Sequence, residues 1–153
     1  MAIIATKDYV FVPTVDIVMD KACFVGTKTH MYIVLDNVQV DRGFWIEALA
    51  NDNLMEKMTF DGQAPKKYIA ELLTQNNLNL EQLHSFFERF GQKWPDGVKI
   101  YDLSKAKTMK VKKGFWIFGG SIVIKFEGDM GFTLITNRIP RPNNVEVSTF
   151  YNT

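Results

Sequence analysis

The first forty residues alternate short apolar runs with turn residues, a pattern that predicts β-strands. Strands are expected at 9–12 and 15–19, and a hairpin is expected over 23–35. Pro13 has no amide hydrogen to donate, so it favours a strand edge or a strand ending. Residues 31–35 are nearly all apolar. We therefore expect the last of these strands to be covered on both faces.

The middle of the chain changes to the spacing of amphipathic helices. Asn79 is a favourable N-cap, and Gln82 follows three residues later, as in a capping box. Gly91 is expected to end that helix, and Pro65 suits the first position of a preceding one. A further helix is expected over 43–57. The best-marked helix carries a stripe of apolar residues at roughly 3.6-residue spacing, namely Leu80, Leu83, Phe86, Phe87 and Phe90.

The last third of the chain returns to the alternation of strands. Strands are expected at 122–127 and 131–136, joined by a turn at Gly128-Asp129. Upstream, Met109 and Val111 alternate with lysines. Residues 145–151 are expected to add one edge strand.

This order of elements predicts a single α+β domain over 1–153. We expect a mainly antiparallel sheet or partly open β-barrel, with a helical segment at about 43–92 inserted between the N- and C-terminal strands and helices on one side or end of the sheet. Hydrophobic residues make up 46% of the chain and aromatic residues 13%. A chain of this size buries roughly 68–70% of its unfolded surface, so the core needs no disulfide or metal.

The formal net charge of +1, from 18 basic and 17 acidic side chains, gives no general attraction to nucleic acid or membranes. Cys23 is the single cysteine, so an intrachain disulfide is excluded and a reducing, cytoplasmic location is expected. The sequence shows no secretory signal and no apolar run long enough for a transmembrane segment. No cofactor is predicted, and the oligomeric state is left open.

The sharpest local feature is a basic cluster followed at once by aromatic residues. On a regular strand, Lys105, Lys107 and Lys113 would share one face, with Lys110 and Lys112 on the other. The cluster suits an acidic protein partner or anionic lipid. The pairing of lysines with aromatic residues also suits single-stranded nucleic acid, which is the less favoured partner because the net charge is balanced. Lysines on an edge strand also prevent sheets from joining edge to edge. The candidate binding residues are Lys105, Lys107, Lys110, Lys112, Lys113, Phe115, Trp116 and Phe118.

No catalytic or metal-binding residue is predicted. Glu81 and His84 have the spacing of a di-iron ligand pair, but such sites need two copies and the chain has one. His84 and Glu88 are more simply an i,i+4 contact on a helix surface. His30 could form a thiol–imidazole pair with Cys23, although a buried structural cysteine is the commoner case.

Other signals for chemistry are weaker. Asp36 and Asp41 flank a turn-like Asn37, without further support for a cation site. The run Gly119-Gly120-Ser121 is like a phosphate loop only superficially, because no lysine or helix follows it.

In residues 98–107 and 109–114, a short strand is expected to lead through the turn Leu103-Ser104-Lys105 into a basic strand. Further strands are expected at 121–126 and 132–135, and an earlier strand pair at 27–34. This order resembles the bacterial pleckstrin-homology-like (GRAM-type) domains, with 98–114 as their middle section. The resemblance implies a partly open barrel or two-sheet sandwich that binds lipids, peptides or proteins without chemistry.

Two departures from that family stand out. About fifty mostly helical residues separate the matching pieces. The family's C-terminal capping helix is also not expected, because Pro140 and Pro142 lie where it should begin.

The sequence thus favours a non-enzymatic binding protein that engages a protein partner, such as a bacterial immunity protein or an adaptor. A pleckstrin-like module for anionic lipid or membrane surfaces is the first alternative. A small enzyme with a site assembled from distant residues is the second.

Overall fold

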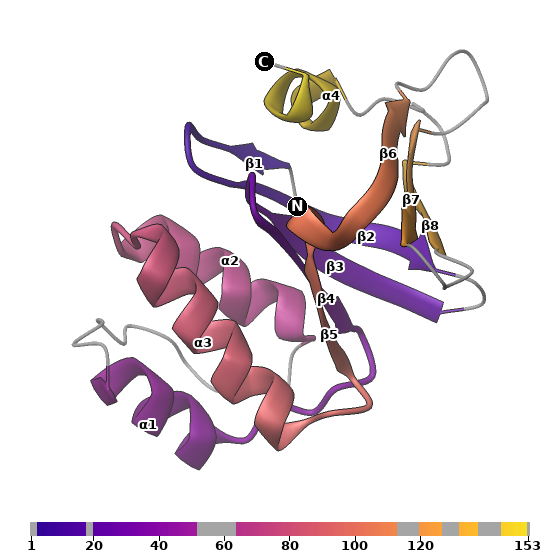
Figure 1. Cartoon of the computed structure of the whole chain (residues 1–153). Helices are drawn as coiled ribbons and strands as arrows, with labels where there is room; N and C mark the ends of the chain where they lie inside the picture. The colour runs from indigo at the N-terminus through magenta and orange to yellow at the C-terminus, as the bar shows by residue number, and fades with distance from the viewer. Residues whose placement is uncertain are drawn as a thin grey trace.

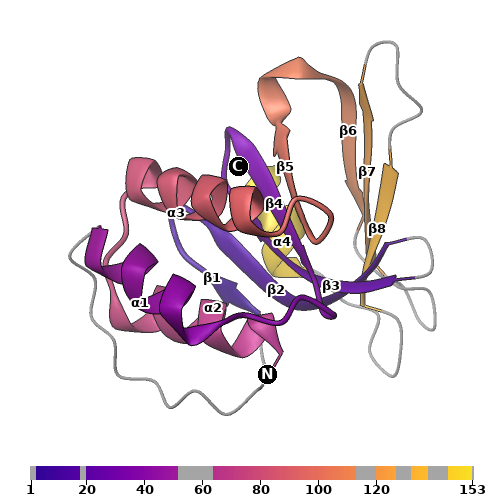
Figure 2. The same ribbon diagram turned by 90° about the horizontal axis from the view of Figure 1, so that it is seen from below.

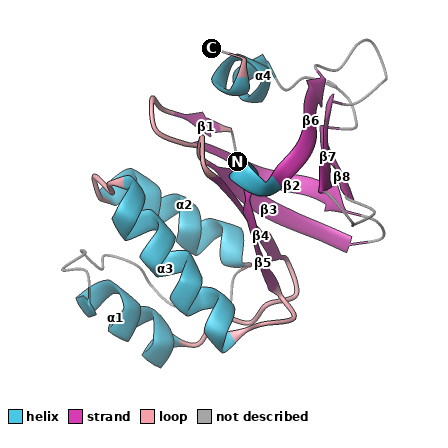
Figure 3. Cartoon of the chain, viewed as in Figure 1, coloured by secondary structure: helices cyan, strands magenta, loops and turns pink. Residues whose placement is uncertain are grey.

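The computed structural model describes residues 3–17, 20–51, 64–112, 120–126, 132–137 and 145–152. Strands and helices alternate in groups, as Figure 3 shows. The strands are β1 (Ile4–Ala5), β2 (Val10–Ile17), β3 (Asp20–Gly26), β4 (His30–Leu35), β5 (Val98–Asp102), β6 (Ala106–Lys112), β7 (Gly120–Phe126) and β8 (Phe132–Asn137). The helices are α1 (Arg42–Asn51), α2 (Pro65–Gln75), α3 (Leu80–Lys93), the 3-10 turn η1 (Leu103–Lys105) and α4 (Val145–Tyr151).

The described strands form one sheet in which each neighbouring pair is antiparallel. The order is β5, β4, β3, β2, β8, β7 and β6, and β1 pairs with β2 off this path. The consecutive strands β5 and β6 therefore lie at opposite ends of this order, and the sheet is not closed. In Figure 2, β6 to β8 stand at a steep angle to β2 and β3. The prediction of an α+β fold with a mainly antiparallel sheet and inserted helices is confirmed in this open form.

The prediction of two strands divided at Pro13 was wrong. Residues 10–17 form the single strand β2, which lies inside the sheet between β3 and β8. The register between β2 and β3 shifts between Val12 and Val15. That irregularity accommodates a proline in an inner strand, because Pro13 cannot donate a ladder hydrogen bond.

Strands β2 to β4 are buried on both faces, since successive side chains point to opposite sides of a sheet. In β4, Tyr32 and Val34 enter one hydrophobic core while Met31 and Ile33 enter the other. The expectation that this strand is covered on both faces is confirmed.

Each of the two cores is named after the elements that cover it. The helix-side core lies under α1 to α3 and includes Phe11, Cys23, Val25, Tyr32, Val34, Trp45, Leu49, Tyr68, Ile69, Leu72, Leu83, Phe86, Phe87 and Phe90. The strand-side core lies between the central strands, β7 and α4, and its described buried residues are Val10, Val12, Val15, Ala22, Phe24, Met31, Ile33, Ile122, Ile124, Val147 and Phe150.

Helix α3 begins as predicted and ends later than predicted. The Asn79 side chain accepts from the Gln82 amide at 2.7 Å, and the Gln82 side chain accepts from the Asn79 amide at 3.1 Å. Gly91 does not stop the helix, which continues to Lys93. A Cβ at Gly91 would stand 3.7 Å from both Val98 and Ile100, so the helix lies close to β5 there.

Residues 145–151 form helix α4, so the prediction of an edge strand was wrong. Val147 and Phe150, three residues apart, share one side of the helix and are buried in the strand-side core. The Lys28 ammonium donates to the Phe150 carbonyl and lies 4.3 Å from the centroid of its ring. Figure 1 shows α4 across the sheet from α1 to α3, so the helices do not gather on one side.

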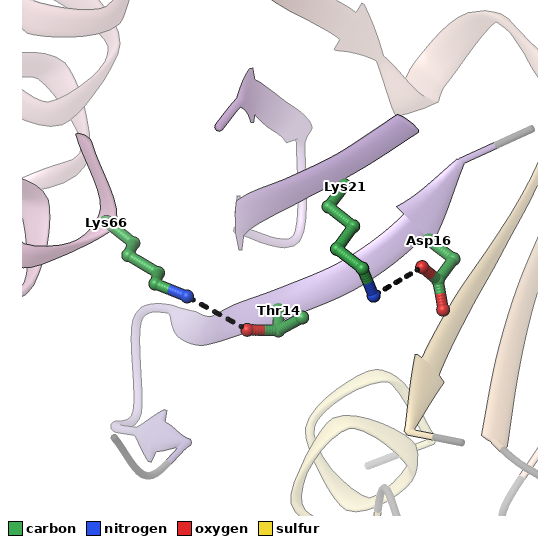
Figure 4. Close-up of polar contacts among 4 residues, drawn as sticks. All are labelled: Thr14, Asp16, Lys21 and Lys66. Carbon is green, nitrogen blue, oxygen red and sulfur yellow. Dashed lines mark hydrogen bonds and ion pairs between the residues drawn. The ribbon is translucent and has the colours of Figure 1, made fainter. Parts of the chain in front are cut away.

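Polar contacts also tie neighbouring elements to β2, as Figure 4 shows. Lys66 of α2 donates to the Thr14 hydroxyl at 3.3 Å. Lys21 of β3 pairs with Asp16 at 3.3 Å. The lysine and threonine of the first contact are on the surface.

The expected turn at Gly128-Asp129 and the part of the expected helix beyond residue 51 lie outside the described residues.

Candidate functional site: the cationic surface of β6 and β7

The described part of the predicted basic cluster lies on η1 and β6. Lys105, Lys107 and Lys110 are exposed, and the backbone of Lys112 pairs with Ser121 of β7. Strand β6 stands at one end of the strand order. The other predicted binding residues, Lys113, Phe115, Trp116 and Phe118, lie outside the described residues.

A bulge in β6 changes which lysines face solvent. Ala106 pairs with Phe126 and Thr108 pairs with Lys125, which leaves Lys107 as an extra residue. The predicted separation of Lys107 from Lys110 on opposite strand faces assumed an uninterrupted alternation, which the bulge breaks. Both are exposed, while Met109 and Val111 pack against the strand-side core.

The charged residues of β6, β7 and β8 are all of one sign. These strands contain four lysines, Lys107, Lys110, Lys112 and Lys125, and no aspartate or glutamate. One of these lysines, Lys125 of β7, is exposed and paired with Thr108. Sequence reasoning missed Lys125, whose signal was its place as the lone charge in the alternating run 120–126. We call Lys105, Lys107, Lys110 and Lys125 the cationic surface.

The turn η1 that begins this surface is fixed by polar contacts. The backbone amide and hydroxyl of Ser104 both donate to the Asp102 carboxylate, at 3.0 and 2.7 Å. The Leu103 amide donates to the Thr29 carbonyl at 2.8 Å. Hydrogen bonding by the Ser104 side chain lowers the pKa of Asp102. The carboxylate therefore stays charged and holds the chain that leads to Lys105.

A separate cluster of polar side chains, outside the predicted basic cluster, connects β4 to α3. The Tyr32 hydroxyl lies 2.6 Å from Nδ1 of His84, and the ring of His30 lies 4.3 Å from that of His84. His84 also pairs with Glu88 through Nε2. The predicted i,i+4 contact of His84 and Glu88 is confirmed.

His30 does not contact Cys23 as one interpretation had suggested. Cys23 pairs with Val34 in the sheet and is buried, whereas His30 pairs with Asp102. Burial raises the pKa of the Cys23 thiol to about 12. At neutral pH the thiol is protonated and shielded, so Cys23 is a structural residue and a poor nucleophile.

The polar group at His84 has the layout of a hydroxyl–imidazole–carboxylate chain, yet its hydroxyl is ill placed for nucleophilic chemistry. Tyr32 is 1% exposed and its ring stacks on Phe87 at 4.5 Å. Burial raises the pKa of Tyr32, which disfavours the reactive phenolate. Among the described residues, no group of three or more His, Cys, Asp or Glu could hold a metal ion.

Two surface hollows flank the C-terminal end of α3. One, of about 410 Å³, is lined by residues of α1 and α3 that include Phe44, Glu47 and Arg89. The other, of about 510 Å³, lies beside Trp94 and the residues before β5. Lys93, which they share, is 3.7 Å from Asp41. Mixed charges line both hollows, so neither points to one class of ligand.

Comparisons with protein-family models, curated proteins and solved structures find no match to this chain. Within the described ranges, no helix has the length and apolar character needed to cross a membrane.

Proposed function

We propose that this chain is a non-enzymatic binding protein that engages an acidic region of a protein partner through the cationic surface. The observation that carries the proposal is the segregation of charge. A chain with a net charge of +1 has four lysines and no acidic residue on β6, β7 and β8. A positive surface of this kind steers an acidic partner toward a defined orientation.

Protection of a sheet edge would explain only part of this surface. Edge lysines block unwanted strand pairing, which fits Lys107 and Lys110 on β6. Lys125 is on β7, an inner strand with β6 on one side and β8 on the other. An inner strand needs no such protection. A binding role accounts for Lys125 together with the β6 lysines.

The energetic scale fits steering better than tight anchoring. An exposed ion pair contributes about 0.2–1 kcal/mol. Four such pairs together would change the dissociation constant by roughly fourfold to several hundredfold, and high salt would weaken them. Apolar contacts elsewhere on the interface would have to supply the remaining affinity.

The test uses two variants with the same change of charge. In the surface variant, four lysines are replaced by glutamine at Lys105, Lys107, Lys110 and Lys125. In the control variant, the same replacement is made at the exposed lysines Lys7, Lys21, Lys67 and Lys99. A host protein captured by the wild-type chain is purified, and its association is measured at two salt concentrations.

We expect the surface variant to lose about tenfold in affinity, mostly through the association rate, and the control variant to keep wild-type binding. Equal losses of affinity in the two variants would mean that only the total charge of the chain matters, and would refute the proposed surface. Unchanged binding in the surface variant would refute it as well.

A pleckstrin-like module for anionic lipid is the second candidate function. The observation that favours it is the order of elements: an antiparallel group of strands, a second group of three strands and a final helix, α4. The segments that carry the family resemblance fall on β4 to β8, and α4 follows these strands in the order in which that family has its last helix. The segment of 42–93, which holds α1 to α3, remains a departure from that family.

Vesicle binding separates the two candidates. A lipid module predicts that the wild-type chain and the control variant bind phosphatidylserine-containing vesicles in low salt, while the surface variant does not. Absence of binding by the wild-type chain would refute the lipid function and leave the protein-partner proposal in place.

A further inference from the structure

The rings of the two histidines of this chain lie close together where the sheet meets the helices. The sequence contains two histidines, His30 on β4 and His84 on α3, separated by more than fifty residues. Their ring centroids are 4.3 Å apart and their planes are tilted by 46°. Such proximity makes the protonation of one ring depend on the charge of the other.

Both ring nitrogens of His84 already have partners. Nδ1 bonds the Tyr32 hydroxyl at 2.6 Å, and Nε2 pairs with the Glu88 carboxylate. A hydroxyl can donate to a neutral imidazole or accept from an imidazolium. The Tyr32 bond is therefore compatible with either state of His84, and Glu88 supplies the countercharge for one proton.

A second proton, on His30, meets a different environment. His30 is half-buried, and its Nδ1 lies 3.0 Å from the Thr29 hydroxyl. The groups that face it are His84 and Glu88 from α3 and Asp102 from β5. Asp102 is already engaged by Ser104 and by the charge of Lys105. The carboxylates attract the proton, but burial and, after it, the neighbouring His84 oppose it more strongly.

We propose that His30 and His84 form a proton-sensitive latch that holds α3 on β4 while the pair carries at most one proton and loosens when it takes up a second. The device is independent of the proposed binding function. It adds a response to acid at the contact between the inserted helices and the sheet.

The sign of the response follows from His30. Burial, followed by the neighbouring His84, lowers the pKa of His30 below its ordinary value of 6.5. In the unfolded or opened state His30 binds its proton at higher pH than in the closed state. The latch is therefore fully stabilising above about pH 6.5 and weakens as the pH falls from there toward the lowered pKa.

The first test is a nuclear magnetic resonance titration of the two imidazoles in the full chain. In the wild type, His30 should titrate below pH 6.5, and in His84→Gln its midpoint should move upward because the competing charge is gone. A His30 midpoint at or above 6.5 in the wild type, or one unmoved by His84→Gln, would overturn the latch.

The second test follows amide exchange, corrected for its intrinsic pH dependence, in α3 and α2. Helix α2 covers the same face of the sheet and contains no histidine. Opening of α3 should rise several-fold relative to α2 between pH 7 and pH 5. His30→Gln should abolish that difference. A wild-type difference that persists in His30→Gln, or no difference at all, would refute the proposal, even if His84→Gln failed to fold.

Discussion

The two hydrophobic cores on either side of strands β2 to β4 contain different kinds of apolar side chain. The helix-side core is rich in aromatic residues, with Trp45 against Phe86 at 5.4 Å and Phe86 against Phe90 at 5.7 Å. Among the described residues, the strand-side core is mostly aliphatic, and its phenylalanines are Phe24 and Phe150. In this part of the chain the sheet thus separates an aromatic-rich core from a mostly aliphatic one.

The cores also differ in how far apart their parts lie in the sequence. Much of the helix-side core comes from the neighbouring helices α1 to α3, between residues 42 and 93. The strand-side core joins β2, β3 and β4 to β7 and α4, from opposite ends of the chain. The sequence pattern of neighbouring residues can therefore specify much of the helix-side core, whereas the strand-side core depends on contacts between residues far apart in the sequence.

The largest loss of stability is expected from truncating a large aromatic side chain in the helix-side core. Phe86 is fully buried and contacts Trp45, Phe87 and Phe90. Phe86→Ala should lower the free energy of unfolding by about 3–5 kcal/mol, through lost burial and the cavity that remains. Chemical denaturation gives the change, with Phe24→Ala of the strand-side core as a matched phenylalanine deletion.

Cys23 can show whether the two sides open separately. Its thiol is in the helix-side core, where labelling requires opening. If the helices open on their own, Phe86→Ala should accelerate thiol labelling more than Phe24→Ala does at equal loss of stability. Equal acceleration would show that the two cores unfold together and would contradict the distinction drawn between them.

The next largest loss of stability is expected where α4 packs on the strand-side core. A Cβ at Gly26 would stand 2.0 Å from the Tyr151 hydroxyl, a distance that real atoms do not adopt. Gly26→Ala should therefore displace the Tyr151 ring and destabilise the chain by about 1–3 kcal/mol. Thermal unfolding gives the size of the change.

A second substitution makes the reason for that loss testable. The Tyr151 hydroxyl is buried, with no hydrogen-bond partner among the described residues. Tyr151→Phe alone should be neutral or slightly stabilising, because it removes an unsatisfied polar group. In the double variant it should recover part of the loss from Gly26→Ala. Strictly additive effects would contradict the proposed clash.

These contrasts explain what the sequence could and could not predict. The start of α3 was predictable because Asn79 and Gln82 form a cap within three residues. Helix α4 was missed, since the alternation of apolar and polar residues over 145–148 also fits a short strand. The choice is made by burial against Ile122 and Ile124, which no local pattern records.

The residues of the candidate site also differ in how far the sequence alone could identify them. Lys105, Lys107 and Lys110 could be found as a cluster, because they are neighbours in sequence. The addition of Lys125 depends on the pairing of β6 with β7 and on the bulge at Lys107. The contact between His30 and His84 depends on where α3 crosses β4, so neither residue alone signalled it.

A smaller effect is expected at the cap that begins α3. Asn79 and Gln82 satisfy each other's backbone amides on the exposed side of the helix-side layer. Asn79→Ala should destabilise the chain by about 1 kcal/mol. Asn77→Ala, at an exposed position two residues earlier, is the control and should be close to neutral. Equal losses from both substitutions, measured by denaturation, would show that the cap itself contributes little.

The smallest effect is expected where a polar contact links the helical layer to the sheet. Lys66 of α2 reaches the Thr14 hydroxyl on β2 at 3.3 Å, and the contact is exposed (Figure 4). Water can replace this hydrogen bond at little cost, so Lys66→Gln should change the free energy of unfolding by less than about 0.5 kcal/mol. Lys67→Gln, at the exposed neighbouring position, controls for the loss of charge. A loss above about 1 kcal/mol for Lys66→Gln alone would mean that polar contacts, and not only aromatic packing, fix the helices on the sheet.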